Sequence, residues 1–190
     1  MSLTAFLVPT LVNQLTAMLA WLDKAESWAA AEGRSVDGLL PLRLAPDMWP
    51  LAAQLKIAAF QAMEPIYRLR GEPVPDAVVA VRTEGSSAGE HPGTLDEGRA
   101  RLKEALALLA TVGSDELDAD PQAPLAHDLP IGIVFDMTRE TYARDWALPQ
   151  VVFHQCMTYA LLRHAGVPLG KIDYAPHLFP YIRPGTMPGM

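Results

Sequence analysis

The sequence predicts an all-α fold, a four-helix bundle with long connecting loops. Half of its 190 residues are hydrophobic while only 7% are aromatic, and a chain rich in alanine, leucine and methionine suits helices packed on helices. Apolar residues also recur at spacings of three and four, the period of one helix face. A chain of this length builds one well-buried core. We therefore expect a single domain over residues 1–174 and a tail rich in proline and glycine over 175–190.

The first helix is expected from Leu3 to Ala31, and Gly33 should end it. One apolar stripe runs along it, formed by Leu7, Leu11, Leu15, Met18 and Leu22. The connection that follows carries several leucines, which should tuck under the bundle.

The second helix is expected to begin at Asp47, whose carboxylate can accept hydrogen bonds from the free amides of a first turn, and to end at Gly71. Its buried stripe consists of Leu51, Leu55, Ala58, Ala62 and Ile66. Residues 72–92 are rich in proline, glycine and serine, so we expect a long loop there.

Thr94 and Glu97 form a capping-box pattern, which predicts a third helix from this point to Gly113. The run IGIVF lies in the strand-like segment near 130–136, and it predicts a small hairpin or an extended segment on the bundle. No internal repeat is present.

The fourth helix is expected from Arg139 to His164, with Pro149 bending it and Gly166 ending it. The residues after it contain too much proline and glycine for a helix.

Composition also limits the function. A net charge of −7 argues against a nucleic-acid partner, which would need clustered lysine and arginine. A single cysteine, Cys156, excludes an intrachain disulfide and suits a reducing compartment, so we expect the cytoplasm. The apolar N-terminal segment lacks a basic start and is interrupted by Asn13 and Gln14, so neither a signal peptide nor a membrane partner is expected.

The fourth helix carries the residues best suited to bind a ligand or take part in a reaction. His154 follows Gln150 by one turn on a largely apolar face, so His154 should face the core or a pocket within it. A buried imidazole needs partners for its nitrogens, and a core histidine satisfied by its neighbours is one interpretation. Cys156 is turned about 200° from His154 around the helix, so we expect it to be an inert thiol. Three other histidines, His91, His127 and His177, fall in loops and are expected at the surface.

Gln150-x-x-x-His154, with Arg163 nine residues further in LLRHAG, resembles the last helix of the DinB/YfiT-like superfamily. The blocks LDKAE (22–26), LRLAPDMWPLAAQ (42–54) and LRHAGVPLGKIDY (162–174) resemble one uncharacterised branch of it. The resemblance implies a four-helix bundle that holds a divalent metal with three histidines, in a metal-dependent hydrolase or thiol-group transferase. His154 matches the second histidine of an HxxxH pair and would be the catalytic residue, as a ligand or general base.

The metal positions implied by the resemblance are His154, Gln150 and Gln54. Gln150 stands where the pair's first histidine should be, and Gln54 is the polar residue that best matches the ligand on the second helix. Amide oxygens are poor ligands for zinc or nickel, so such an ion would bind weakly and the sequence favours no tightly held metal. The site is therefore expected to be degenerate.

The alternative is a non-catalytic protein that has lost the metal site. Gln54, Gln150 and His154 would then form the polar floor of a pocket for a small-molecule ligand, with Trp49 and Met48 in its wall. A dimeric structural protein is the third interpretation, because the C-terminal tail could lie across a second copy. A homodimer is the expected partner.

Overall fold

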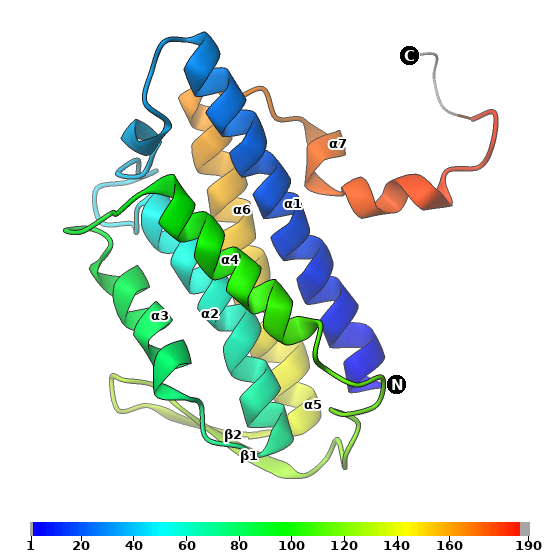
Figure 1. Ribbon diagram of the computed structural model, residues 1–190. Coiled ribbons are helices and arrows are strands. Elements are labelled where there is room, and N and C mark those ends of the chain that lie inside the picture. Colours follow the sequence, from blue (N-terminus) through cyan, green and yellow to red (C-terminus); the bar gives the residue numbers. More distant parts are fainter. Residues whose placement is uncertain (1, 187–190) are drawn as a thin grey trace.

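The computed structural model describes residues 2–186, and in this part it has the four long helices that the sequence predicts: α1 (Leu3–Ala31), α2 (Leu51–Arg70), α4 (Leu95–Leu109) and α6 (Leu148–Ala165). Both α1 and α2 pack against α4 and α6, while α1 and α2 have little contact with each other. The two helices therefore lie diagonally across the bundle (Figure 1). The predicted fold class is confirmed.

The apolar stripe of α1 forms one side of the core. Leu7, Leu11, Leu15, Met18 and Leu22 are all fully buried, as expected. The leucines of the following connection, which contains η1 (Val36–Leu39), are also buried at Leu39 and Leu40. Among the described helices, α1 has the length and hydropathy that would suffice to cross a membrane, and its leucines pack in the protein core here.

α2 begins at Leu51, not at Asp47, so the predicted start is wrong. Pro50 precedes the helix with an extended backbone, and a proline disfavours the helical conformation for the residue before it. Gly71 ends the helix in the left-handed conformation, as expected. Unlike a helix with one buried stripe, α2 is buried at every position from Leu51 to Ile66. Its polar residues therefore lie inside the protein.

The burial of α2 depends on α3 (Asp76–Ser87), a helix where the sequence predicts a long loop. Its valines lower helix propensity in isolation, but Val78 and Val81 are buried at the contact with α2. Gly85 allows close approach, since a Cβ atom there would lie 2.5 Å from the Cδ1 of Ile57. Tertiary packing therefore overrides the local signal, and the loop prediction is wrong.

The predicted capping box opens α4. Thr94 Oγ1 accepts a hydrogen bond from the Glu97 amide at 3.2 Å, and the Glu97 carboxylate accepts one from the Thr94 amide at 3.1 Å. The helix ends at Leu109, before the predicted end at Gly113.

We expect Thr94→Ala to lower the free energy of unfolding by about 1 kcal/mol, because the Glu97 amide at the start of α4 loses its acceptor, Thr94 Oγ1. The measurement is urea unfolding followed by circular dichroism. Thr111→Ala is the matched control, since this exposed hydroxyl binds only the carbonyl of Leu108. Equal effects of the two substitutions would contradict the assignment.

The strand-like segment forms a hairpin, as predicted, with the end of the run IGIVF in its second strand. β1 (Pro124–Asp128) pairs antiparallel with β2 (Val134–Thr138). Residues 130–133 belong to the turn, in which Gly132 has a φ of +83° and its amide binds the carbonyl of Leu129. The alternating burial of β1 points Leu125 and His127 inward.

The fourth predicted helix is one continuous helical run with a local change of winding. It consists of α5 (Arg139–Thr141), the π-helical η2 (Tyr142–Ala147) and α6. Pro149 has no N–H to donate to the carbonyl one turn earlier, which favours such a defect just before it. The run ends at Ala165, and Gly166 caps it with a φ of +105°.

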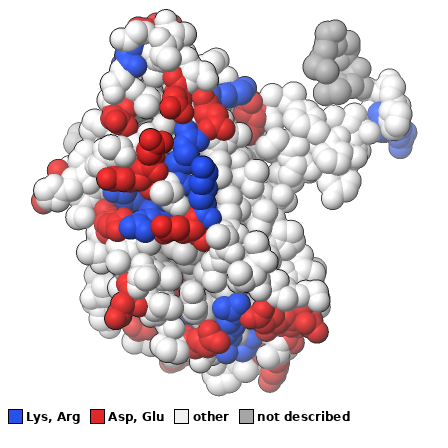
Figure 2. Space-filling model, in the orientation of Figure 1, with Lys and Arg blue, Asp and Glu red and all other residues white. Residues whose placement is uncertain are grey.

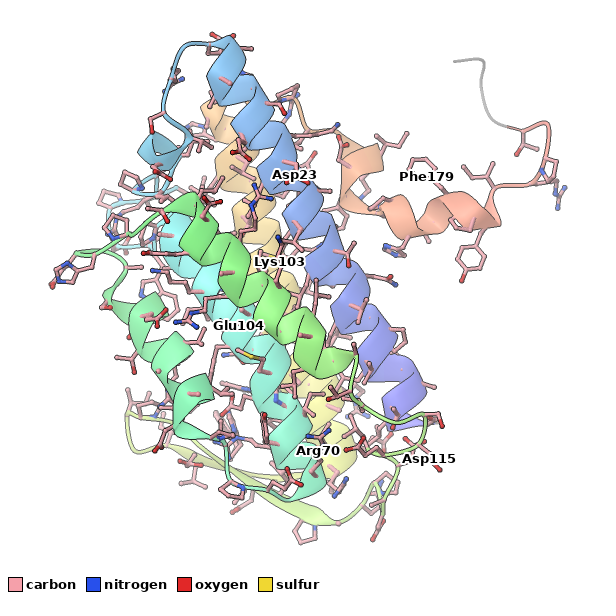
Figure 3. All side chains as sticks on the ribbon, in the orientation of Figure 1. Asp23, Arg70, Lys103, Glu104, Asp115 and Phe179 are labelled. Carbon is pink, nitrogen blue, oxygen red and sulfur yellow. The ribbon has the colours of Figure 1, made fainter. Side chains whose placement is uncertain are left out.

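Two short helices follow that the sequence does not predict, α7 (Lys171–Tyr174) and η3 (Pro176–Tyr181). α7 is anchored on α1, because the Trp21 indole N–H donates to the Asp173 carbonyl at 2.7 Å and stacks on Tyr174. Residues 175–186, which we call the arm, then extend away from the bundle (Figure 1). Figure 3 shows Phe179 on this arm.

Charged side chains of both signs are interspersed on the face drawn in Figure 2. Arg99 pairs with Asp23 and Glu26, which joins α4 to α1. Arg101 pairs with Glu84, which joins α4 to α3. Arg99 and Arg101 are thus engaged in ion pairs with neighbouring helices.

Candidate ligand-binding site

The structure brings two of the predicted site residues together in the groove between α2 and α6. The Gln54 side-chain oxygen and the His154 Nδ1 lie 2.8 Å apart, and both side chains are buried. The Gln54 side-chain nitrogen donates to the Trp49 carbonyl at 3.1 Å. Gln54 therefore presents its oxygen to the imidazole, and His154 Nδ1 must be the donor.

This arrangement makes His154 a neutral imidazole. Burial lowers the pKa of His154 to about 4, so at neutral pH the ring carries its proton on Nδ1 and a lone pair on Nε2. A general base works best when its pKa lies near the operating pH. His154 is therefore a weak candidate for proton transfer, and its Nδ1 is satisfied within the core.

The other predicted pocket residues lie around this pair. Trp49 stacks on the imidazole with ring centres 6.0 Å apart, and Phe153 meets its edge at 5.3 Å. Together with Asp47, Met48 and Gln54 they line a small cavity of about 270 Å³. Gln150 is only half-buried, and its side chain makes no hydrogen bond to another residue within 2–186.

These residues do not fit the zinc or nickel ion that the resemblance implies. The Gln54 oxygen already accepts from His154, and Gln150 does not join them. In the part of the chain that the structure describes, no three histidine, cysteine, aspartate or glutamate side chains gather closely enough to hold an ion. One imidazole with amide oxygens is a poor set for such metals.

A second group of buried polar residues lies around Gln61, two helical turns beyond Gln54 on α2. Gln61 is buried, and its side-chain oxygen has no hydrogen-bond partner among the described residues. The same is true of both His127 ring nitrogens, the Trp146 indole nitrogen and the Tyr142 hydroxyl. Buried polar groups are nearly always paired, so this concentration of unpaired atoms indicates a binding site.

Three of these residues lie at a larger cavity of about 550 Å³ between α2, α3, the hairpin turn and η2. Gln61, His127 and Trp146 line it, and Trp49 forms a wall shared with the small cavity beside His154. The His127 ring lies 4.5 Å from the Trp146 ring and 5.1 Å from Tyr142. Tyr142 and Trp146 both belong to the π-helical η2, and such segments often occur at functional sites.

Charge at the cavity is balanced. Arg68 donates to the buried Glu64 at 2.9 Å and to Asp128 at 3.2 Å. Burial raises the pKa of Glu64, although the Arg68 guanidinium acts in the opposite direction. Burial, helped by Arg68, lowers the pKa of His127 to about 4. The imidazole of His127 is therefore neutral at pH 7.

The prediction that His127 lies in a surface loop is wrong, and the site around it was therefore not expected. The residue lies on β1 and is 1% exposed. A signal was present in the run PLAHD, where Leu125 and His127 share one face of a strand. His91 is exposed as expected, whereas His177 is half-buried.

We expect the ring C–H resonances of His127 and His154 to stay unchanged between pH 8 and pH 6 in an NMR titration, because both pKa values are near 4. The unfolded chain binds protons at about 6.5, so it takes up more protons than the folded one as the pH falls from 6.5 toward 4. Stability should therefore be complete above pH 6.5 and decrease by about 1.4 kcal/mol per pH unit for each histidine below it. A midpoint near 6.5 for either ring would contradict its burial.

Comparisons with known proteins agree with the fold. A family model described as a domain of unknown function, DUF1993, matches residues 3–175. The chain is also similar to the crystal structure of a DinB family member protein from Shewanella denitrificans, with a TM-score of 0.75 and 28% sequence identity. That match covers 98% of this chain and 96% of the other. None of the curated proteins matches the chain.

Proposed function

The chain belongs to the DUF1993 family and has the DinB fold, and from this premise we propose that it binds a small molecule in the cavity beside His127 and Trp146. The observation that carries the proposal is the set of unpaired polar atoms of Gln61, His127 and Trp146 in one lining. Each costs about 1–3 kcal/mol when buried without a partner. A bound molecule that pairs with them would recover this cost.

The size and position of the cavity support the same function. About 550 Å³ falls within the range of roughly 300–1,000 Å³ typical of small-molecule pockets. Aromatic and apolar side chains with a few convergent polar groups are also the usual composition of such pockets. The hairpin turn over the cavity contributes Leu129, Pro130 and Ile131.

The test is saturation-transfer NMR with a set of small aromatic compounds. Thr83→Trp places a large ring in the cavity lining from an exposed position of α3, so it should abolish binding. Ala80→Trp is the matched control, since Ala80 is exposed on the same helix outside that lining. The proposal fails if the native chain binds none of the compounds, or if both variants bind as the native chain does.

The metal-dependent hydrolase or thiol-group transferase is the weaker function for this chain, because His154 and Gln54 satisfy each other. We expect elemental analysis of protein purified without chelators or affinity-tag nickel to give far less than one metal ion per chain. One zinc or nickel ion per chain in every preparation would restore the metal-dependent function.

Self-association is a second candidate function, favoured by the exposed apolar residues of the arm. Leu178, Phe179 and Tyr181 are 55%, 41% and 83% exposed. A chain that ends at Tyr174 keeps the contacts of Trp21 with Asp173 and Tyr174. Light scattering should find the full chain dimeric and the shortened chain monomeric, and a dimeric shortened chain would contradict this function.

A further inference from the structure

The chemistry of the cavity beside His127 also limits what can bind there. Three aromatic rings contribute to its walls: Trp49 and Phe60 from the α2 side, and Trp146 from η2. Trp146 packs against both His127, at 4.5 Å, and Phe135, at 5.6 Å. Rings attract other rings by stacking or edge contact, worth about 0.5–1.5 kcal/mol beyond buried area. These walls favour a planar aromatic molecule.

The unpaired atoms require both donors and acceptors from the ligand. The Gln61 oxygen can only accept a hydrogen bond, and the Trp146 indole N–H can only donate one. The neutral His127 ring offers one nitrogen of each kind. A molecule with a donor and an acceptor close together, as in a carboxamide or a nitrogen heterocycle with an exocyclic amine, would satisfy the whole set.

The charged side chains at the cavity balance in number, although Arg82 has no ion-pair partner among the described residues. Glu64 and Asp128 line it, and both bind Arg68 behind them. Arg82, the remaining charged residue of the lining, lies over the Phe60 ring at 5.4 Å. With two acidic and two basic side chains the site has no net charge. Because burying an uncompensated ion is costly, a neutral ligand is favoured over a charged one.

We propose that the cavity between Gln61, His127 and Trp146 binds an uncharged planar aromatic molecule that carries an amide-like pair of donor and acceptor. The inference rests on the proposed function and specifies its ligand class. The aromatic ring packs against Trp146, the donor of the ligand reaches the Gln61 oxygen, and its acceptor receives the Trp146 N–H. His127 supplies a further contact of either kind.

The experiment compares four probes of similar shape, benzamide, benzoate, benzamidine and toluene, by NMR titration of the full chain at pH 7. Benzamide is neutral, benzoate is negative and benzamidine is positive, and the three otherwise have similar shapes. Toluene has no polar atoms. We expect benzamide to bind at least tenfold more tightly than each of the others, which corresponds to about 1.4 kcal/mol. Gln61→Leu should weaken the binding of benzamide about tenfold and leave the affinity for toluene unchanged.

The possible outcomes distinguish a failure of the ligand class from a failure of the proposed function. If benzoate, benzamidine or toluene binds as tightly as benzamide, the inference is overturned while the cavity remains a binding site. If Gln61→Leu leaves benzamide binding unchanged, the assigned contact is overturned. If none of the four probes binds, while other aromatic compounds are blocked by Thr83→Trp, the ligand class alone fails. If no compound of either set binds, the proposed function fails with it.

Discussion

Gln61→Leu is expected to raise the free energy of unfolding by about 1 kcal/mol, because it removes a buried acceptor that no neighbouring residue satisfies. Gln54→Leu, the same substitution two turns earlier on α2, should lower it by about 2 kcal/mol, because His154 Nδ1 then loses its acceptor at 2.8 Å. Both side chains are buried on one helix. Opposite signs of the two stability changes would therefore reflect the difference in hydrogen bonding and not a difference in burial. Urea unfolding of the two variants measures the difference.

The same pair of variants separates stability from binding. Gln61→Leu should lose affinity for the aromatic probes while it gains stability, which is the usual cost of a functional polar group in a protein interior. Gln54→Leu should keep that affinity, since Gln54 lies in the lining of the small cavity beside His154 and not in the larger one. A loss of stability in Gln61→Leu would mean that its oxygen is already paired in the free protein.

The second large effect is expected at the two buried histidines. His154→Leu should lower the free energy of unfolding by about 2–3 kcal/mol, because the Gln54 oxygen is left unpaired and the stacking with Trp49 is lost. His127→Leu leaves no partner unpaired among residues 2–186, and the removal of its two unpaired nitrogens offsets the lost ring contacts with Tyr142 and Trp146, so stability should change by less than about 1 kcal/mol.

Ligand binding should follow the reverse pattern. His127→Leu removes a polar group from the larger cavity and should abolish probe binding, whereas His154→Leu should preserve it. Thermal unfolding and probe titration of the same preparations give both quantities. If His154→Leu abolished binding with little loss of stability, the functional site would lie at His154 and not at His127.

Residue spacing alone predicts much of the helical scaffold. The stripe of α1, the glycine ends of α2 and α6, and the Thr94 capping box are local features, and each lies where the sequence indicates. The DinB resemblance in the last helix is likewise carried by neighbouring residues, and the solved relative confirms it. Sequence patterns predict the structure correctly where residues within one helical turn of each other determine it.

The missing parts depend on contacts between distant segments. The valines of α3 gain their helical conformation by packing on α2, and that packing buries the face of α2 that one apolar stripe would leave in water. Gln61 and Glu64 therefore become interior residues only because α3 exists. The sequence predicts that Gln54 and His154 lie in one site, and the two side chains are hydrogen-bonded. The approach of His127 to Trp146 requires the hairpin to fold over η2, which no local pattern predicts.

The most direct test of the account records the indole N–H signals of the four tryptophans before and after addition of the tightest-binding aromatic probe. The Trp146 N–H has no partner in the described chain, while the Trp21 N–H donates to the Asp173 carbonyl at 2.7 Å. Trp146→Phe assigns the signal. The account predicts that the Trp146 signal shifts as the probe is added, with the same dissociation constant as probe binding, while the Trp21 signal stays in place. A Trp146 signal that does not move at saturating probe would contradict a ligand site beside His127.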